Sequence, residues 1–149
     1  MLLLQMELLN LRLLIFLDNL SMSTIFSKIL NGEIPCYKVA ESELFLAFLD
    51  INPLVIGHVL VIPKVEVDYI FDLDDSILSE MILFSKSVSK KIKNAFECKK
   101  VGVSVIGLEV PHAHIHLIPL NSIADMNFSN QKLKISSERM LEIQSIINS

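Results

Sequence analysis

The sequence predicts an α+β domain: one antiparallel five-stranded sheet, one long helix on a face of that sheet, and short helices near the two ends of the domain. Five segments of strand length are rich in apolar or β-branched residues, and one long segment carries apolar residues at spacings of three and four. The connections between the first three predicted strands are short, which favours an antiparallel meander. In this class of architecture the long helix covers one face of the sheet.

The first elements follow from caps, helix breakers and apolar runs. Thr24 is a suitable N-cap for a short helix, and Asn31 with Gly32 ends that helix before Pro35. Three strands are predicted at residues 37–40, 44–50 and 58–62. The third is the clearest because its sequence, His-Val-Leu-Val-Ile, is mostly β-branched and apolar.

The second half of the chain contains the long helix. Acidic residues around Asp74 favour a helix start, and lysines follow near the C-terminal end of the same segment. The apolar positions of this helix are Ile77, Met81, Phe84, Val88, Ile92 and Ala95. The last two strands are predicted at residues 101–106 and 112–118. Pro119 is expected to stop the second of these, and Ser136 or Ser137 caps a final helix.

The composition fits one globular domain. The chain has 149 residues, of which 52% are hydrophobic and 20% charged, so a folded core is expected rather than disorder. The net charge is −4 and no long basic run occurs, which argues against a broad nucleic-acid surface. Cys36 and Cys98 are far apart in the sequence, and two reduced thiols in a cytoplasmic protein explain them better than a disulfide or a zinc site.

Residues 1–21 differ from the rest of the chain and are expected to lie outside the fold, which we place at residues 22–149. Glu7, Arg12 and Asp18 interrupt this leucine-rich leader, so it fits neither a membrane span nor a secretory signal well, and no membrane association is expected. Met22 is then the expected natural start. Two alternatives stay open: a signal or anchor, and a peripheral helix that packs its leucines against the domain or a partner.

Three of the four histidines lie in one short segment at a spacing of two. On a strand, His112, His114 and His116 would point to the same face, while Ala113 and Ile115 would point to the core. Three imidazoles on one face need a polar partner. The pattern has three interpretations: a solvated strand face without chemistry, a metal site, or a face that handles phosphate.

The metal and phosphate interpretations make different demands on these rings. Imidazole suits Zn, Cu or Ni, but the outer two residues of the three are ~13 Å apart on a straight strand at ~3.3 Å per residue. One ion would therefore need ligands from elsewhere, such as His58. In the phosphate interpretation one neutral imidazole attacks phosphorus near pH 7, and its neighbours donate hydrogen bonds to the oxygens.

The segment from His112 to Ile118 resembles the signature of the histidine-triad (HIT) family, in which three alternating histidines precede two hydrophobic residues. Two further segments are similar to the family. Residues 25–35 resemble its opening helix, and residues 48–64 resemble its central hairpin. The resemblance covers residues 24–120 and implies a HIT-like fold. Within the family, the sequence is most similar to the branch that includes the purine nucleoside phosphoramidases.

The resemblance also implies roles for individual residues. His114 would be the nucleophile that forms a nucleotidyl-histidine intermediate, His112 and His116 would contact the phosphate or orient His114, and His58 would complete the network. Asp50 would accept hydrogen bonds from the ribose hydroxyls, although a turn cap before Asn52 and Pro53 explains it too. The apolar walls around the base would be Ile25, Phe26, Ile29, Phe48 and Ile51. For these apolar residues, packing in the core is the simpler alternative.

One segment departs from the family pattern. Many members carry a longer glycine-rich loop with an Asn and a Gly-Gln pair before the triad, whereas this chain has only Gly107 to Pro111 there. Leu108 stands where the Gln would be. Glu109 brings a negative charge toward the phosphates unless its side chain turns to solvent. Substrate preference and rate are the properties that this change would affect.

The resulting hypothesis is a hydrolase or transferase that acts at the α-phosphate of a purine nucleotide derivative, of the nucleoside phosphoramidate or dinucleoside polyphosphate type. By the resemblance it needs neither a metal nor another cofactor and forms a homodimer, the commonest oligomer. Two other functions stay open. One is a nucleotide-sensing or protein-binding module with little turnover, and the other is a metal-binding protein that uses the histidines.

Overall fold

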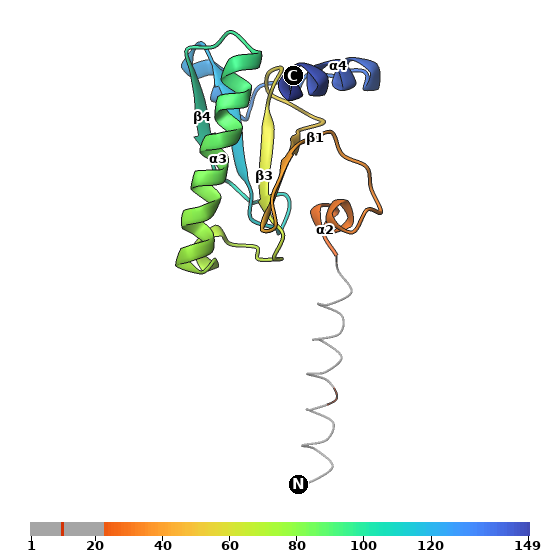
Figure 1. Cartoon of the computed structure of the whole chain (residues 1–149), viewed down its shortest axis with the longest axis vertical. Coiled ribbons are helices and arrows are strands. Elements are labelled where there is room, and N and C mark those ends of the chain that lie inside the picture. The colour runs from red at the N-terminus through yellow and green to blue at the C-terminus, as the bar shows by residue number, and fades with distance from the viewer. Residues whose placement is uncertain (1–9, 11–22) are drawn as a thin grey trace.

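The computed structural model describes Asn10 and residues 23–149. The fold elements in that part are α2 (Ile25–Leu30), β1 (Lys38–Glu41), β2 (Phe45–Leu49), β3 (Val59–Pro63), the 3-10 turn η1 (Ile70–Asp72), α3 (Asp75–Ala95), β4 (Lys100–Ser104), β5 (Ile115–Leu120), the 3-10 turn η2 (Ile123–Met126) and α4 (Ser137–Asn148). The strands form one antiparallel sheet in the order β1-β2-β3-β5-β4 (Figure 1). The predicted α+β class, the five strands and the meander of the first three are confirmed. The leader prediction concerns residues almost all of which lie outside the described part.

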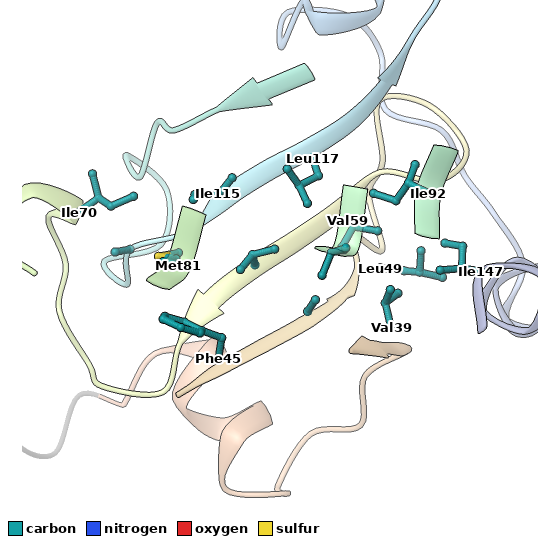
Figure 2. Packing of buried hydrophobic residues seen from close by; sticks show 14 of the residues in the cluster. Val39, Phe45, Leu49, Val59, Ile70, Met81, Ile92, Ile115, Leu117 and Ile147 are labelled. Carbon is teal, nitrogen blue, oxygen red and sulfur yellow. The ribbon is translucent and has the colours of Figure 1, made fainter. Parts of the chain in front are cut away.

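The sheet is covered on both faces, and each face has its own apolar cluster. On one face α3 and α4 pack against alternate strand residues such as Phe45 and Val59, and Figure 2 shows Met81 and Ile92 of α3 lying over the strands. On the other face Phe26 of α2 packs with a smaller group of strand residues, namely Leu46, Phe48, Leu60 and Ile62. This two-sided burial explains why β2 and β3 are apolar at every position rather than alternating.

The last strand begins later and ends later than the sequence predicts. β5 starts at Ile115, so His112 and His114 precede it and only His116 lies within it. The prediction that one strand carries all three histidines is therefore wrong. Pro119 lies inside the strand, because beyond Leu117 the strand pairs with β4 alone and the missing N–H of the proline breaks no bond to β3.

The two edges of the sheet differ in how they are covered. At the β1 edge, side chains from α4 reach the backbone: Gln144 Nε2 and Asn148 Nδ2 donate hydrogen bonds to the Lys38 carbonyl at 3.0 and 3.1 Å. The β4 edge exposes apolar side chains, with Val103 59% and Val105 43% exposed. An uncovered apolar edge is a natural place for another strand to pair.

No helix in residues 23–149 is long and apolar enough to cross a bilayer.

Gly57 sets the turn that delivers His58 to the start of β3. Its φ is +92°, a left-handed conformation that side chains with a Cβ rarely adopt. A Cβ at this position would also lie 2.8 and 2.9 Å from two ring carbons of Phe96 and 3.3 Å from Pro119. Both the backbone conformation and the close packing therefore require glycine here.

We predict that Gly57→Ala lowers the free energy of unfolding by about 2–4 kcal/mol, from backbone strain and overpacking together. The control is Gly107→Ala, because Gly107 has a φ of +70° but no atom within 4 Å of its added Cβ. Strain alone should cost that variant about 1–2 kcal/mol. Urea denaturation measures both values, and equal losses would contradict a packing role for Gly57.

Candidate active site

A pocket of about 430 Å³ opens on the sheet face that α2 covers. Its walls come from α2, the end of β2, the loop before β5 and the segment that follows η2. Nine of the ten predicted site residues line it: Ile25, Phe26, Ile29, Phe48, Asp50, Ile51, His58, His114 and His116. His112 is the one that does not. Residues from four separate parts of the sequence therefore meet at one cavity.

His112 is an internal anchor of the segment that carries His114. Its side chain is fully buried, and its Nε2 donates a hydrogen bond to the Pro63 carbonyl at 2.9 Å. The Thr24 hydroxyl lies 3.5 Å from its Nδ1. This position differs from the expected shared face, because the chain is not yet a strand at His112 and the alternation of side chains does not apply there.

One hydrogen bond fixes the proton of His114. Its Nδ1 lies 2.7 Å from the carbonyl oxygen of His112, which can only accept, so Nδ1 carries the proton. In the neutral ring, Nε2 then carries the lone pair. The ring of Phe26 packs nearly perpendicular to this ring, with centroids 5.1 Å apart. His114 thus has a fixed tautomer in the wall of the pocket, with the lone pair of the neutral ring on Nε2.

A second chain of hydrogen bonds orients His116. The backbone N–H of Leu54 donates to Nδ1 of His58 at 3.1 Å, so neutral His58 carries its proton on Nε2. That nitrogen donates to Nδ1 of His116 at 2.9 Å. Neutral His116 therefore carries its own proton on Nε2. The chain leaves a ring N–H donor on His116, whose ring centroid lies 4.9 Å from that of His114.

Burial keeps these supporting rings neutral. Desolvation lowers the pKa of His58 from 6.5 to about 4 and that of His116 from 6.5 to about 3, and nearby positive charge adds to both shifts. Desolvation lowers the pKa of His112 as well. Neutral rings are what the hydrogen-bond chain requires, because a doubly protonated His58 could not accept from Leu54.

Asp50 serves the turn and faces the pocket at the same time. Its Oδ1 accepts a hydrogen bond from the backbone N–H of Asn52 at 2.9 Å, which is the turn cap considered from the sequence. Its Oδ2 lies 3.6 Å from Nε2 of His58 and belongs to a residue in the pocket wall. The cap therefore holds the carboxylate where one oxygen is available to a ligand.

Asp50, His58 and His116 also form a group whose potential metal-ligand atoms lie within 4.8 Å of one another. The hydrogen bonds do not fit a metal ion there. His58 already uses Nδ1 as an acceptor, so a metal on Nε2 would leave the ring without a proton or break the bond from Leu54. The geometry suits a proton-ordered chain of rings better than a coordination site.

The sequence interpretation did not identify Phe128 and Lys132, which complete the pocket wall. The ring of Phe128 packs at 73° to that of His116 with centroids 4.9 Å apart. Nζ of Lys132 lies 5.1 Å from the centre of the Phe128 ring and donates to the Phe128 carbonyl at 3.0 Å. Both residues lie between η2 and α4, in a stretch without strand or helix periodicity, so no sequence pattern marked them.

The loop before β5 forms the rim of the pocket. Gly107, Leu108 and Glu109 all line it, and Leu108 is 89% exposed. Glu109 is exposed too. The departure from the family pattern thus lies at the mouth of the pocket, where it would meet a ligand without altering the histidines below.

The model of the HIT domain matches residues 31–123 of this sequence. The chain belongs to the HIT family. The resemblance carried by the histidine segment and the hairpin is confirmed, and so is the fold that it implies.

Individual HIT proteins resemble the chain over most of its length. A HIT-like protein of Borreliella burgdorferi is 37% identical, over 80% of this chain and 91% of that protein. The adenosine 5′-monophosphoramidase of Schizosaccharomyces pombe is 40% identical, over 66% of this chain and 74% of the enzyme. A solved structure from Sulfolobus tokodaii, named a hypothetical histidine triad nucleotide-binding protein, is 30% identical with a TM-score of 0.70, and the match covers 83% of this chain and 88% of that one.

We predict that acid destabilises this HIT protein through His58 and His116. The unfolded chain takes up protons near pH 6.5, whereas the folded rings take them up only near pH 4 and pH 3. The stabilisation is therefore complete above about pH 7 and is lost as the pH falls from there toward 4, by roughly 3–5 kcal/mol at pH 4.5. Urea denaturation at a series of pH values measures this loss.

The same prediction can be checked ring by ring. Long-range ¹⁵N–¹H NMR spectra distinguish the tautomers, and both rings should keep the proton on Nε2 down to about pH 5. Titration of either ring near pH 6.5 would contradict the hydrogen-bond chain.

Proposed function

We propose that this protein binds a purine nucleotide derivative in the pocket and cleaves a bond at its α-phosphate through His114. The hydrogen bond from Nδ1 of His114 to the His112 carbonyl carries the proposal, because it leaves Nε2 as the nucleophilic nitrogen. The name of the Schizosaccharomyces pombe relative, an adenosine 5′-monophosphoramidase, supports this class of reaction. The name of the Sulfolobus tokodaii protein supports nucleotide binding.

The proposed reaction has two displacements. Nε2 of His114 attacks the α-phosphorus, a P–N bond forms, and the bond to the leaving group breaks with its electron pair on that group, which takes a proton from solvent. The positive charge on the ring is stabilised by the bond from Nδ1–H to the His112 carbonyl. Water then attacks the phosphorus and gives up a proton to solvent, the P–N bond breaks with its electron pair on Nε2, and the nucleoside monophosphate leaves.

The supporting groups stabilise charge on the phosphate. The N–H on Nε2 of His116 is the donor next to the attacking nitrogen, and the chain from Leu54 through His58 holds that donor in place. Phosphoryl transfer depends on positioning and charge stabilisation more than on covalent machinery. In this proposal no step requires a metal ion or another cofactor.

The rest of the nucleotide has matching surfaces. The purine would lie against the apolar walls, which include Ile25 and Ile51 at 44% and 59% exposure. Exposed apolar side chains in a cavity are available to a ligand in a way that core residues are not. Oδ2 of Asp50 would accept from the ribose hydroxyls while Oδ1 keeps its turn bond.

A second candidate is a nucleotide-sensing or protein-binding module with little turnover. The rim favours it, because Glu109 adds a carboxylate and Leu108 offers no side-chain donor to a phosphate. The leaving group of the first candidate would be an amine, a phosphate or an acyl phosphate. For either candidate we propose a cytoplasmic location, on the basis of the two free cysteines Cys36 and Cys98.

We also propose that the protein is a homodimer joined at β4. The opposite edge is occupied by contacts from α4, whereas Val103 of β4 and Val105, which follows the strand, are exposed. Pairing of two β4 strands across a two-fold axis would continue the sheet and cover these side chains.

His114→Ala should reduce release of nucleoside monophosphate from a nucleoside 5′-phosphoramidate by at least about 10³-fold, because the nucleophile is lost. Nucleotide affinity, measured by calorimetry with AMP, should change little. Intact mass spectrometry of the unsubstituted protein during turnover should show a nucleotidyl adduct on His114. If the unsubstituted protein binds AMP but turns over no phosphoramidate or dinucleoside polyphosphate, the module is the correct alternative.

Val103→Arg should convert the dimer to a monomer in sedimentation velocity at micromolar concentration, because it places two charges against each other at the joined edge. The control is Leu141→Arg, which changes a side chain of α4 that is similarly exposed, at 57%. That variant should stay dimeric. A monomer for the unsubstituted protein, or a dimer for Val103→Arg, would rule out this interface.

A further inference from the structure

A polar contact outside the pocket joins α2 to the loop that follows β3. Oγ of Ser27 donates a hydrogen bond to Oε1 of Glu66 at 2.7 Å, and neither residue lines the pocket. The bond connects residues 39 positions apart in the sequence, and its acceptor is a carboxylate, which strengthens it. The reaction proposed above gives neither side chain a role.

On the α2 side, this contact reaches His112 through Thr24, the N-cap of the helix. The Thr24 hydroxyl oxygen lies 3.2 Å from Oγ of Ser27 and 3.5 Å from Nδ1 of His112. Because Nε2 of His112 donates to the Pro63 carbonyl, Nδ1 of the neutral ring is an acceptor, and Thr24 is its one hydrogen-bonding partner within residues 23–149. The ring of Phe26 in α2 also packs against His112, with centroids 5.8 Å apart.

On the loop side, the contact reaches the same segment through the backbone. The carbonyl of Val67, which follows Glu66, accepts a hydrogen bond from the N–H of Ala113 at 2.7 Å. Ala113 lies between His112 and His114, so this bond holds the segment in which the His112 carbonyl accepts from Nδ1 of His114. The two routes together enclose His112.

The contacts around His112 connect two parts of the pocket that a substrate must meet at the same time. The proposed purine wall includes Ile25 and Ile29 of α2, and the proposed nucleophile is His114. The base would lie on the first and the α-phosphorus at the second, so the position of α2 relative to the His114 segment affects the alignment for attack. A misplacement of about 1 Å can cost a factor on the order of 10² in rate.

We propose that Ser27 and Glu66 position His114 relative to α2, through the contacts around His112. This inference rests on the proposed function and adds two positioning residues to it. Neither residue touches the substrate in this proposal. Binding of AMP uses the pocket walls, which keep all their side chains when the pair is changed, whereas attack requires alignment of the phosphorus with Nε2 of His114. The pair should therefore affect kcat much more than nucleotide affinity.

Ser27→Ala removes the contact without weakening the helix. Alanine is a better helix former than serine, and the cap bond from the backbone N–H of residue 27 to Thr24 remains. The kcat for adenosine 5′-phosphoramidate should fall about three- to tenfold, the effect of one hydrogen bond, while AMP affinity in calorimetry should change little. The control is Ser79→Ala, because Ser79 is an exposed serine of α3 whose hydroxyl bonds to the Asp75 carbonyl in the same helix. It should keep the kcat of the unsubstituted protein.

A double-mutant cycle tests whether the two residues act through each other. Glu66→Ala should lose as much kcat as Ser27→Ala, and the double variant should lose no more than either one, because each change removes the same bond. Glu66→Gln should restore most of the activity, since its amide oxygen can accept from Ser27. Additive losses in the double variant, or a loss of AMP affinity as large as the loss of kcat, would overturn the positioning role.

Hydrogen exchange measures the same contact without turnover. The amide of Ala113 should exchange about three- to tenfold faster in Ser27→Ala than in the unsubstituted protein, and at an unchanged rate in Ser79→Ala. An unchanged rate in Ser27→Ala would also overturn the inference. If the unsubstituted protein turns over no nucleotide, the proposed reaction is wrong, and the exchange rate of Ala113 alone decides whether Ser27 and Glu66 hold the segment.

Discussion

The hydrogen bond from Nδ1 of His114 to the carbonyl of His112 is the constraint on which the site depends. It determines which nitrogen of His114 carries the lone pair in the neutral ring, and it requires the His112 carbonyl to stay in place. Burial of the His112 side chain and its bond to the Pro63 carbonyl at the end of β3 meet that requirement. His112, which does not line the pocket, thereby determines the tautomer of His114, which does.

A second constraint acts through the turn between β2 and β3. Leu54 and Asp50 in this turn both reach the histidine cluster, one through a backbone N–H to His58 and the other through a carboxylate 3.6 Å from the same ring. Gly57 allows the turn to close directly before β3. Proton order in His116 is therefore set by backbone geometry more than 50 residues earlier in the chain, through the Leu54 N–H and the His58 ring.

One face of the sheet carries the larger apolar cluster, and the other face carries the pocket. On one face α3 and α4 form the larger apolar cluster, and on the other α2 covers only part of the surface. The part next to α2 is the pocket, whose exposed apolar side chains include Ile25 and Ile51. Because β2 and β3 belong to both faces, the site rests on the most buried strands of the protein.

The sequence by itself determined the elements and the reactive segment. The β-branched run predicted at 58–62 is β3, the regular apolar spacing after Asp74 is α3, and the alternating histidines with the hairpin segment indicated the family that the comparison then confirmed. These features are local, because each is a spacing of neighbouring residues that matches the repeat of a helix, a strand or a family motif.

Tertiary structure alone decided three other matters. His112 turned inward because β5 begins only at Ile115, a boundary set by pairing with β3 and not by the alternation of the residues. The tautomers of His58 and His116 follow from a contact with Leu54 that no spacing predicts. Phe128 and Lys132 reached the pocket from a stretch without periodic structure. Contacts between distant segments depend on how whole elements pack, and no local pattern in a single sequence predicts that packing.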